Sequence, residues 1–118
     1  MQYMLLIYNA PDAGPAPGSP EFQAQRGRWM EYTQQLQQSG AMVAGDALEG
    51  GDTATTVRQR NGDRVVSDGP FAETKELLGG YYLIDVPDLD TALDWAGKMP
   101  NIAYGSVEVR PIMDVSGG

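Results

Sequence analysis

Tyr3-Met4-Leu5-Leu6-Ile7-Tyr8, close to the start of the chain, is apolar at every position, and this run constrains the fold more strongly than any other. Successive side chains of an extended strand point to opposite faces, so both faces of this strand are apolar. A strand of that kind is buried on both sides in a folded protein. We therefore expect residues 1–8 to form a strand inside a sheet that is covered on each face.

The elements that follow are predicted from the residues at their boundaries. Ser19-Pro20 is typical of a helix start, with a hydroxyl N-cap and then proline at the first helical position, and Gly40 is suited to end that helix. Asp88 is suited to cap a second helix. Asn61-Gly62 indicates a tight hairpin, because both central residues of a type I′ turn adopt positive φ. Further strands are expected at 42–48, 53–60, 64–67, 80–86 and 106–112.

The two predicted helices each carry an apolar stripe at helical spacing. On the first helix the stripe comprises Phe22, Trp29, Thr33 and Leu36, and on the second it comprises Leu89, Ala92, Leu93 and Ala96. We expect these stripes to pack on the sheet.

The predicted order is β-α-β, a hairpin and β-α-β, which is an α+β unit of ferredoxin-like topology in a single domain over residues 1–118. Two helices can cover only one face of the sheet, so the second apolar face of the first strand needs another cover. The same face of a second copy is the simplest cover, and we expect a homodimer whose two sheets pack together. The alternative is a monomer in which long loops cover that face.

Composition excludes several function classes. The chain of 118 residues contains neither cysteine nor histidine, which excludes disulfides, thiol nucleophiles, Ser-His pairs and His-ligated metals. Its formal net charge of −8 disfavours binding to nucleic acid and to anionic membranes. No apolar run approaches the roughly 20 residues that span a bilayer, and no signal-peptide pattern is present, so the cytoplasm is the expected location. We expect neither a metal nor a cofactor.

The most distinctive motif is the nonapeptide at residues 68–76, Asp-Gly-Pro-Phe-Ala-Glu-Thr-Lys-Glu, which is followed by Gly-Gly-Tyr-Tyr at 79–82. Supporting stretches are Thr-Thr-Val-Arg at 55–58 and Gly-Ser-Val-Glu-Val-Arg-Pro-Ile at 105–112. With these motifs, the chain resembles the DGPF-domain proteins of the YCII-related superfamily over nearly its whole length. The resemblance implies a dimeric α/β barrel built from ferredoxin-like protomers.

The resemblance implies less about activity. The superfamily has a proposed His-Asp pair in a cleft, whereas this chain has no histidine. The place of that histidine on the first helix falls near Trp29, and the place of the aspartate lies in the region of Gly45-Asp46. The proposed chemistry therefore does not carry over to this chain. Some DGPF-domain proteins also resemble companions of extracytoplasmic-function sigma factors, which implies a regulatory context.

The nonapeptide supplies the candidate catalytic residues. In an enzyme, Asp68 or Glu73 would act as the base, and Lys75 or Arg110 would hold an oxyanion. The alternative interpretation is structural, because Asp, Gly and Pro are the residues that build turns, Phe71 would be buried as an anchor, and the charged residues would be solvated.

Aromatic and charged residues elsewhere are candidate ligand-binding groups. Tyr81 and Tyr82 are neighbours on one strand and point to opposite faces, so only one of them can face a given cleft. Trp29 has packing in the core as its alternative role, and Glu108 and Arg110 have a solvated edge or pairing across the dimer. The full set of ligand-binding candidates is Trp29, Asp46, Glu76, Tyr81, Tyr82, Glu108 and Arg110.

Three functions follow, and the sequence leaves them open. The first is a small-molecule-binding or regulatory accessory module with a cleft at the dimer interface. The second is a small enzyme that uses carboxylate, tyrosine and lysine acid–base chemistry without histidine or metal. The third is an interaction module for a transcription regulator such as a sigma factor.

Overall fold

The structure is a computed structural model that describes residues 1–72 and 74–115. Its elements match the predicted order, and the largest shift is at the fifth strand, which begins at Leu77 rather than Gly80. The elements are β1 (Gln2–Asn9), α1 (Pro20–Gln38), β2 (Met42–Ala47), a short 3-10 helix (Gly51–Thr53), β3 (Thr55–Arg60), β4 (Asp63–Asp68), β5 (Leu77–Asp85), α2 (Leu89–Gly97) and β6 (Ser106–Pro111).

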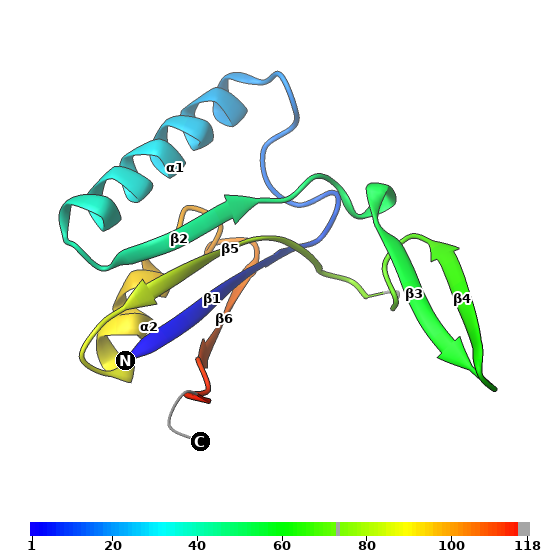
Figure 1. The fold of residues 1–118 in the computed structure, drawn as a ribbon. Coiled ribbons are helices and arrows are strands. Elements are labelled where there is room, and N and C mark those ends of the chain that lie inside the picture. The colour runs from blue at the N-terminus through cyan, green and yellow to red at the C-terminus, as the bar shows by residue number, and fades with distance from the viewer. Residues whose placement is uncertain (73, 116–118) are drawn as a thin grey trace.

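Four of the strands form one antiparallel sheet in the order β2-β5-β1-β6. The apolar run at residues 3–8 therefore lies in a central strand, β1, with β5 on one side and β6 on the other (Figure 1). This mixed α+β arrangement is compatible with the predicted ferredoxin-like topology. No helix in the described part of the chain is long and apolar enough to cross a bilayer.

Local capping chemistry sets the ends of both helices as predicted. The Ser19 hydroxyl accepts a hydrogen bond from the Phe22 N–H at 3.1 Å, with Pro20 as the first helical residue of α1. Gly40 follows the end of that helix with φ of +83°, a conformation in which glycine is unstrained. The Asp88 carboxylate caps α2 by accepting from the N–H of Thr91 at 2.8 Å.

One face of the sheet carries the core. Tyr3, Leu5 and Ile7 alternate along β1 and are buried, and Leu5 is completely inaccessible. Both helices pack on this face, and together with the sheet they enclose one cluster of buried side chains. The buried members are Tyr3, Leu5, Ile7, Tyr32, Leu36, Ala41, Ile84, Val86, Ala92 and Met99.

The buried side of α1 differs from the predicted stripe. Gln25, Tyr32 and Leu36 are its buried residues, whereas Trp29 is half-buried. Gln25 is tolerated inside because its amide nitrogen donates to the Pro100 carbonyl and to the Tyr104 hydroxyl.

The buried side of α2 is also narrower than predicted. Ala92 and Ala96 are buried, but Leu89 and Leu93 are each 48% exposed. The small side chains bring α2 close to the sheet, and the two leucines lie on the flank of the helix.

No helix in the described part of the chain covers the opposite face of the sheet (Figure 1). Alternation places Met4, Leu6 and Leu83 there, all half-buried, with Leu6 aligned with Tyr81 across the β1–β5 pair. This open face is the one for which the sequence predicted a second cover.

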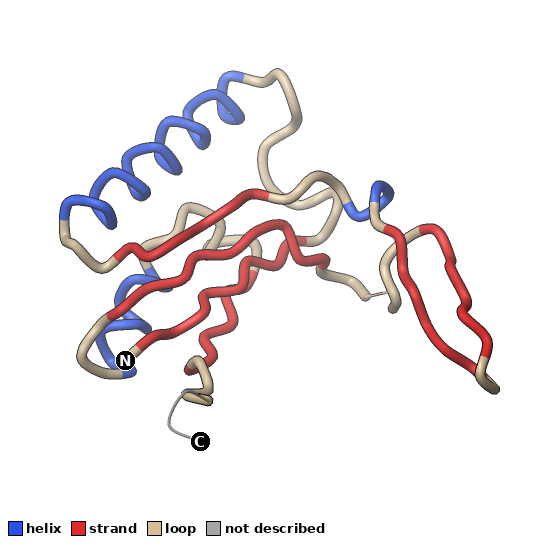
Figure 2. The backbone as a smooth tube through the Cα atoms, viewed as in Figure 1, coloured by secondary structure: helices blue, strands red, loops and turns tan. Residues whose placement is uncertain are grey.

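β3 and β4 form a separate two-stranded sheet, which we call the arm (residues 55–68). The arm projects away from the four-stranded sheet (Figures 1 and 2), and the radius of gyration is accordingly 16.5 Å. A compact chain of this length has a radius of gyration of about 13–14 Å. At its tip, Asn61 and Gly62 have φ of +53° and +81°, which confirms the predicted hairpin turn.

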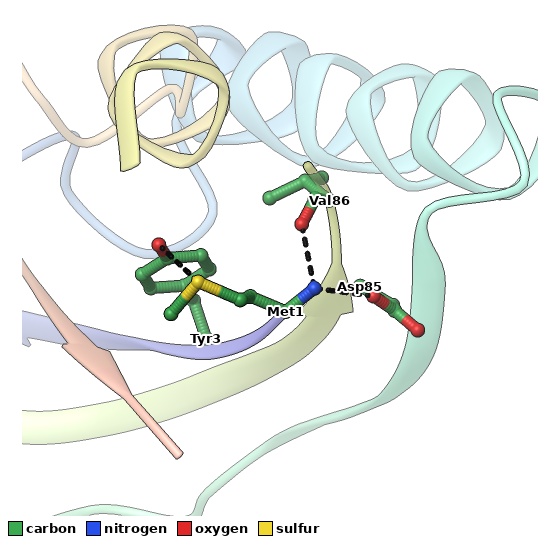
Figure 3. Close-up of polar contacts among 4 residues, drawn as sticks. All are labelled: Met1, Tyr3, Asp85 and Val86. Carbon is green, nitrogen blue, oxygen red and sulfur yellow. Dashed lines mark hydrogen bonds and ion pairs between the residues drawn. The ribbon is translucent and has the colours of Figure 1, made fainter. Parts of the chain in front are cut away.

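The start of the chain is tied to the end of β5. The Met1 ammonium group donates to the Val86 carbonyl at 2.9 Å and contacts the Asp85 carboxylate at 3.2 Å (Figure 3). The Tyr3 hydroxyl lies 3.6 Å from the Met1 sulfur. These contacts hold the first residues against the sheet at the end remote from the arm.

Candidate functional site

A cavity of about 380 Å³ lies between α1 and the sheet. The helix contributes Trp29 and Thr33, and the sheet contributes residues from β1, β2 and β5. The lining residues are Ile7, Asn9, Trp29, Thr33, Met42, Gly45, Asp46, Ala47, Gly79, Gly80, Tyr81 and Tyr82. The sequence predicted a cleft between two copies, whereas this cavity is formed within one chain.

Glycines form much of the cavity floor, for steric reasons. A Cβ atom at Gly45 would lie 2.7 Å from the ring of Tyr82, and one at Gly80 would lie 2.9 Å from the Asp46 carbonyl oxygen. Gly45 therefore makes room for the tyrosine ring, and Gly80 allows β2 and β5 to approach closely. Both glycines, together with Gly79, are among the residues that line the cavity.

Aromatic rings build the wall behind the cavity. The Tyr32 ring makes edge-to-face contacts with Trp29, Tyr82 and Trp95, at centroid distances of 6.1, 5.4 and 5.9 Å. The Tyr32 hydroxyl donates to the Trp95 carbonyl at 2.9 Å, and burial raises the pKa of the Tyr32 phenol well above its ordinary value. Tyr32 is therefore a neutral structural support that holds Trp29 and Tyr82 in place.

Tyr82 is the tyrosine of the pair that faces the cavity, which the sequence alone left undecided. Its hydroxyl lies 2.5 Å from the Thr33 hydroxyl, so α1 and β5 are hydrogen-bonded across the cavity. Two hydroxyls contain two hydrogens, and only one is needed between them. The pair can therefore offer a ligand one donor as well as acceptor lone pairs.

Tyr81 and Asp46 form a pair on the open face of the sheet. The Tyr81 hydroxyl donates to the Asp46 carboxylate at 2.7 Å, and this hydrogen bond raises the pKa of the Tyr81 phenol. The two residues are aligned across β2 and β5, one position away from the Gly45–Tyr82 pair. Alternation directs their side chains away from α1, so both contribute to the cavity lining from the strand backbone.

The structure places the nonapeptide away from this cavity. Asp68 is exposed at the end of β4, Lys75 is exposed in the loop before β5, and neither residue lines the cavity. Glu73, the other proposed base, lies outside the described residues. A second hollow of about 500 Å³ at the base of the arm is lined by Pro70, Phe71 and Leu77 among others, and the Asp68 and Lys75 side chains are not part of it.

The position of Phe71 differs from the one predicted. The structural interpretation of the nonapeptide predicted that Phe71 is buried as an anchor, but its side chain is 76% exposed. The reason is that the arm projects from the sheet, so no core of the same chain reaches this position. The turn chemistry of the motif is confirmed in contrast: Gly69 has φ of +91°, and its N–H donates to the Ala54 carbonyl at 2.7 Å.

The remaining charged candidates lie apart from the cavity. Glu76 accepts a hydrogen bond from the Ser106 hydroxyl at 3.3 Å. Glu108 and Arg110 form an ion pair with each other at 3.3 Å on the open face, where they align with Leu6 and Met4 of β1. Within residues 1–72 and 74–115, no three His, Cys, Asp or Glu side chains gather closely enough to hold a metal ion.

Of the predicted ligand-binding residues, Trp29 and Tyr82 line the cavity from the side that faces α1, whereas Asp46 and Tyr81 line it through the strand backbone and direct their side chains to the open face. Sequence reasoning did not assign Asn9, Thr33 and Met42 to a site. The available signals were weak: Asn9 is the first polar residue after the apolar run, and Thr33 lies four residues after Trp29 on the same helix face.

Comparison with known proteins supplies the family. The YCII-related domain matches residues 1–116, and the chain belongs to this family. An uncharacterised protein of Rhizobium meliloti (strain 1021) is 54% identical over 61 residues, a match that spans 50% of this chain and 49% of that protein. The relative has no described activity to compare.

A solved structure shares the fold at low sequence identity. It is a 5-chloro-2-hydroxyhydroquinone dehydrochlorinase from Burkholderia phenoliruptrix AC1100 in complex with 2,5-dihydroxybenzoquinone. The TM-score is 0.50 at 11% identity, and the match covers 100% of this chain and 99% of that one. At this identity the similarity concerns the fold alone.

Proposed function

We propose that this member of the YCII-related family binds a small, flat, largely apolar molecule in the cavity between α1 and the sheet. The observation that carries the proposal is the glycine-floored cavity of about 380 Å³, with the aromatic rings of Trp29 and Tyr82 in its lining. Small-molecule sites typically have volumes of about 300–1,000 Å³ and combine apolar walls with a few polar groups. The Thr33–Tyr82 hydroxyl pair is such a polar group.

The composition of the lining supports binding rather than acid–base catalysis. Trp29 lies where the family resemblance implies a histidine, and an indole cannot exchange protons as an imidazole does. Asp46, near the implied place of the aspartate, directs its side chain to the other face of the sheet. We accordingly propose a sensor or accessory module. Association with a transcription regulator, which the resemblance implies, stays a prediction.

Binding is tested with 2,5-dimethoxybenzoquinone, an uncharged ether of the flat ring 2,5-dihydroxybenzoquinone that the dehydrochlorinase neighbour holds. We expect saturable NMR shifts of the Trp29 indole N–H and of the Thr33 and Tyr82 amides, while amides at the arm tip do not move. Trp29→Ala should weaken binding about tenfold or more, because a buried aromatic contact is lost. Gln34→Ala, on the exposed side of α1, is the matched control.

The result separates the candidate functions. Saturable binding with unchanged ligand after long incubation supports the binding module. Chemical conversion of the probe that is lost with Asp68→Asn or Lys75→Ala would favour the acid–base enzyme instead. The absence of any saturable shift, for this probe and for a panel of similar flat rings, would contradict the proposal.

We also propose that two copies associate through the open face, as in a dimeric α/β barrel. The support is the apolar centre of that face, formed by Met4, Leu6 and Leu83, which no element of the same chain covers among the described residues. Sedimentation should give the mass of a dimer, and Leu6→Asp should yield the mass of a monomer that remains folded. A monomer at every concentration of the unmodified chain would contradict this assembly.

A further inference from the structure

One residue of the cavity lining, Asn9, is hydrogen-bonded to a buried asparagine behind it. Asn9, at the end of β1, lines the cavity, and Asn101, in the loop between α2 and β6, is completely buried. The Asn101 Nδ2 donates to Asn9 Oδ1 at 3.0 Å and also lies 3.5 Å from the Ser106 carbonyl oxygen. Residues 92 positions apart in the sequence thus meet at the ligand cavity.

This pair determines which way the Asn9 amide points. The Ser106 carbonyl can only accept, so the nitrogen of the Asn101 amide faces it at 3.5 Å, while Asn101 Oδ1 is buried without a hydrogen-bond partner among the described residues. The same nitrogen then requires an acceptor on Asn9, which fixes Asn9 Oδ1 toward Asn101. The two hydrogens on Asn9 Nδ2 are left over, and no group among the described residues accepts from them.

The asparagine pair packs directly against the backbone of Gly105. A Cβ atom at Gly105 would lie 2.0 Å from Asn9 Oδ1, 2.6 Å from the Tyr8 carbonyl oxygen and 3.0 Å from Asn101 Nδ2. Any larger residue would push Asn9 away from Asn101. Glycine at position 105 therefore gives the Asn9 and Asn101 side chains room to meet.

We propose that the Asn9 amide is the hydrogen-bond donor that selects the ligand, and that the ligand presents a neutral carbonyl oxygen, as in a ketone, quinone or amide. This inference rests on the proposed function of the cavity. The described lining residues include no lysine or arginine, and the chain carries a net charge of −8, so a neutral carbonyl suits the site better than a carboxylate. Asn101 is the positioning residue.

The test compares two probes of nearly the same shape, acetophenone and isopropylbenzene, of which only acetophenone has an oxygen acceptor. Binding is followed by the NMR shift of the Trp29 indole. The unmodified chain should bind acetophenone roughly three- to tenfold more tightly, the range that one neutral hydrogen bond provides. Benzoate, which adds a negative charge to the same ring, should bind more weakly than acetophenone.

Variants of Asn9 assign the preference to its amide. Asn9→Ala should bind both uncharged probes equally, and Asn9→Asp, which presents an acceptor in place of the donor, should prefer isopropylbenzene. Tyr8→Phe, at the neighbouring position with its side chain on the open face, is the control and should keep the preference. The folded state of each variant is checked from the dispersion of the same spectra.

The outcomes distinguish a failure of the Asn9 assignment from a failure of the proposed ligand binding in the cavity. If neither uncharged probe shifts the NMR signal of the Trp29 indole N–H, the proposed binding function is contradicted, and so is the role of Asn9 that rests on it. If both probes bind the unmodified chain equally well, or if Asn9→Ala keeps the preference for acetophenone, the cavity binds ligands but Asn9 is not the selecting donor. A preference for benzoate would overturn the neutral-carbonyl assignment.

Discussion

The four-stranded sheet with its two helices and the β3–β4 arm differ in what stabilises them. In the sheet and its helices, Leu5, Leu36 and Ile84 are completely buried. In the arm, Val57 and Val66, which face each other across the two strands, are 57% and 55% exposed. Strand pairing and turn chemistry are present in both regions, but apolar packing is confined to the sheet and helices. An isolated hairpin is only marginally stable in water, so the arm depends on its attachment or on a partner.

Charge distinguishes the two regions as well. The arm carries Arg58, Arg60 and Arg64 against Asp63 and Asp68, a net charge of +1, while the chain as a whole carries −8. The residues outside the arm therefore carry −9. The arm, which lacks a core, is therefore also the less acidic of the two regions.

The largest expected difference between the regions comes from truncating apolar side chains. Leu36→Ala should lower the free energy of unfolding by about 3 kcal/mol, because it leaves a cavity in the core. Val66→Ala in the arm should cost less than about 0.5 kcal/mol, the usual range for exposed positions. Urea denaturation at low protein concentration measures both values. Equal losses would mean that the arm is packed against something in solution.

Replacing a glycine by alanine in each region is expected to affect stability differently in the sheet and in the arm. Gly80→Ala should destabilise the protein by about 1–3 kcal/mol, since its Cβ would meet the backbone of β2. Gly62→Ala, at positive φ in the arm turn, carries a left-handed cost of about 1–2 kcal/mol. We expect this second cost to appear in faster amide exchange of β3 and β4, with global unfolding in urea unchanged. A matching loss in global unfolding would show that the arm and the sheet unfold together.

Tyr32→Phe should cost about 1 kcal/mol at neutral pH, the typical value of one lost hydrogen bond. Because burial raises the pKa of Tyr32 in the folded protein, its stabilising effect is present below the ordinary value of about 10 and is lost as pH rises above it. The unmodified chain should therefore lose stability above pH 10 more steeply than the variant. Thermal melts at pH 8 and pH 11 test this, and parallel curves would contradict it.

The smallest effect is expected at the cap of α2. Hydrogen bonds from the Thr91 hydroxyl and the Thr91 N–H lower the pKa of Asp88, so its contribution is present at neutral pH and is lost as pH falls through the acidic range below about 4. Asp88→Asn keeps a capping side chain without the charge and should reduce this acid sensitivity, with little change at pH 7. Melts at pH 7 and pH 3 provide the measurement, and Asp90→Asn is the control.

Features that depend on neighbouring residues were predicted correctly. The Ser19 and Asp88 caps, the Asn61-Gly62 turn and the element order all appear where the sequence placed them. Each depends on a side chain and a backbone group within a few residues, so no knowledge of the tertiary arrangement is needed.

Features that depend on which surfaces meet were predicted less well. Phe71 was expected to be buried because it is aromatic, but the direction of the arm leaves it exposed. Gln25 is not part of the predicted apolar stripe, yet it is buried, because partners from the segment after α2 satisfy its amide inside the protein. The candidate catalytic residues were chosen from the nonapeptide because of its charged side chains. The cavity is instead lined by the Gly-Gly-Tyr-Tyr stretch that follows it.

By itself, the amino-acid sequence determined the strands, the helix ends, the hairpin and the central position of the first strand, because alternation, capping and turn propensity act over short distances. Only the tertiary structure decided that Tyr82 rather than Tyr81 faces the helix, that Gly45 makes room for the Tyr82 ring, and that Asn101 is hydrogen-bonded to Asn9. Those relations join groups from distant parts of the chain, and their geometry depends on strand register and helix placement, which no local pattern encodes.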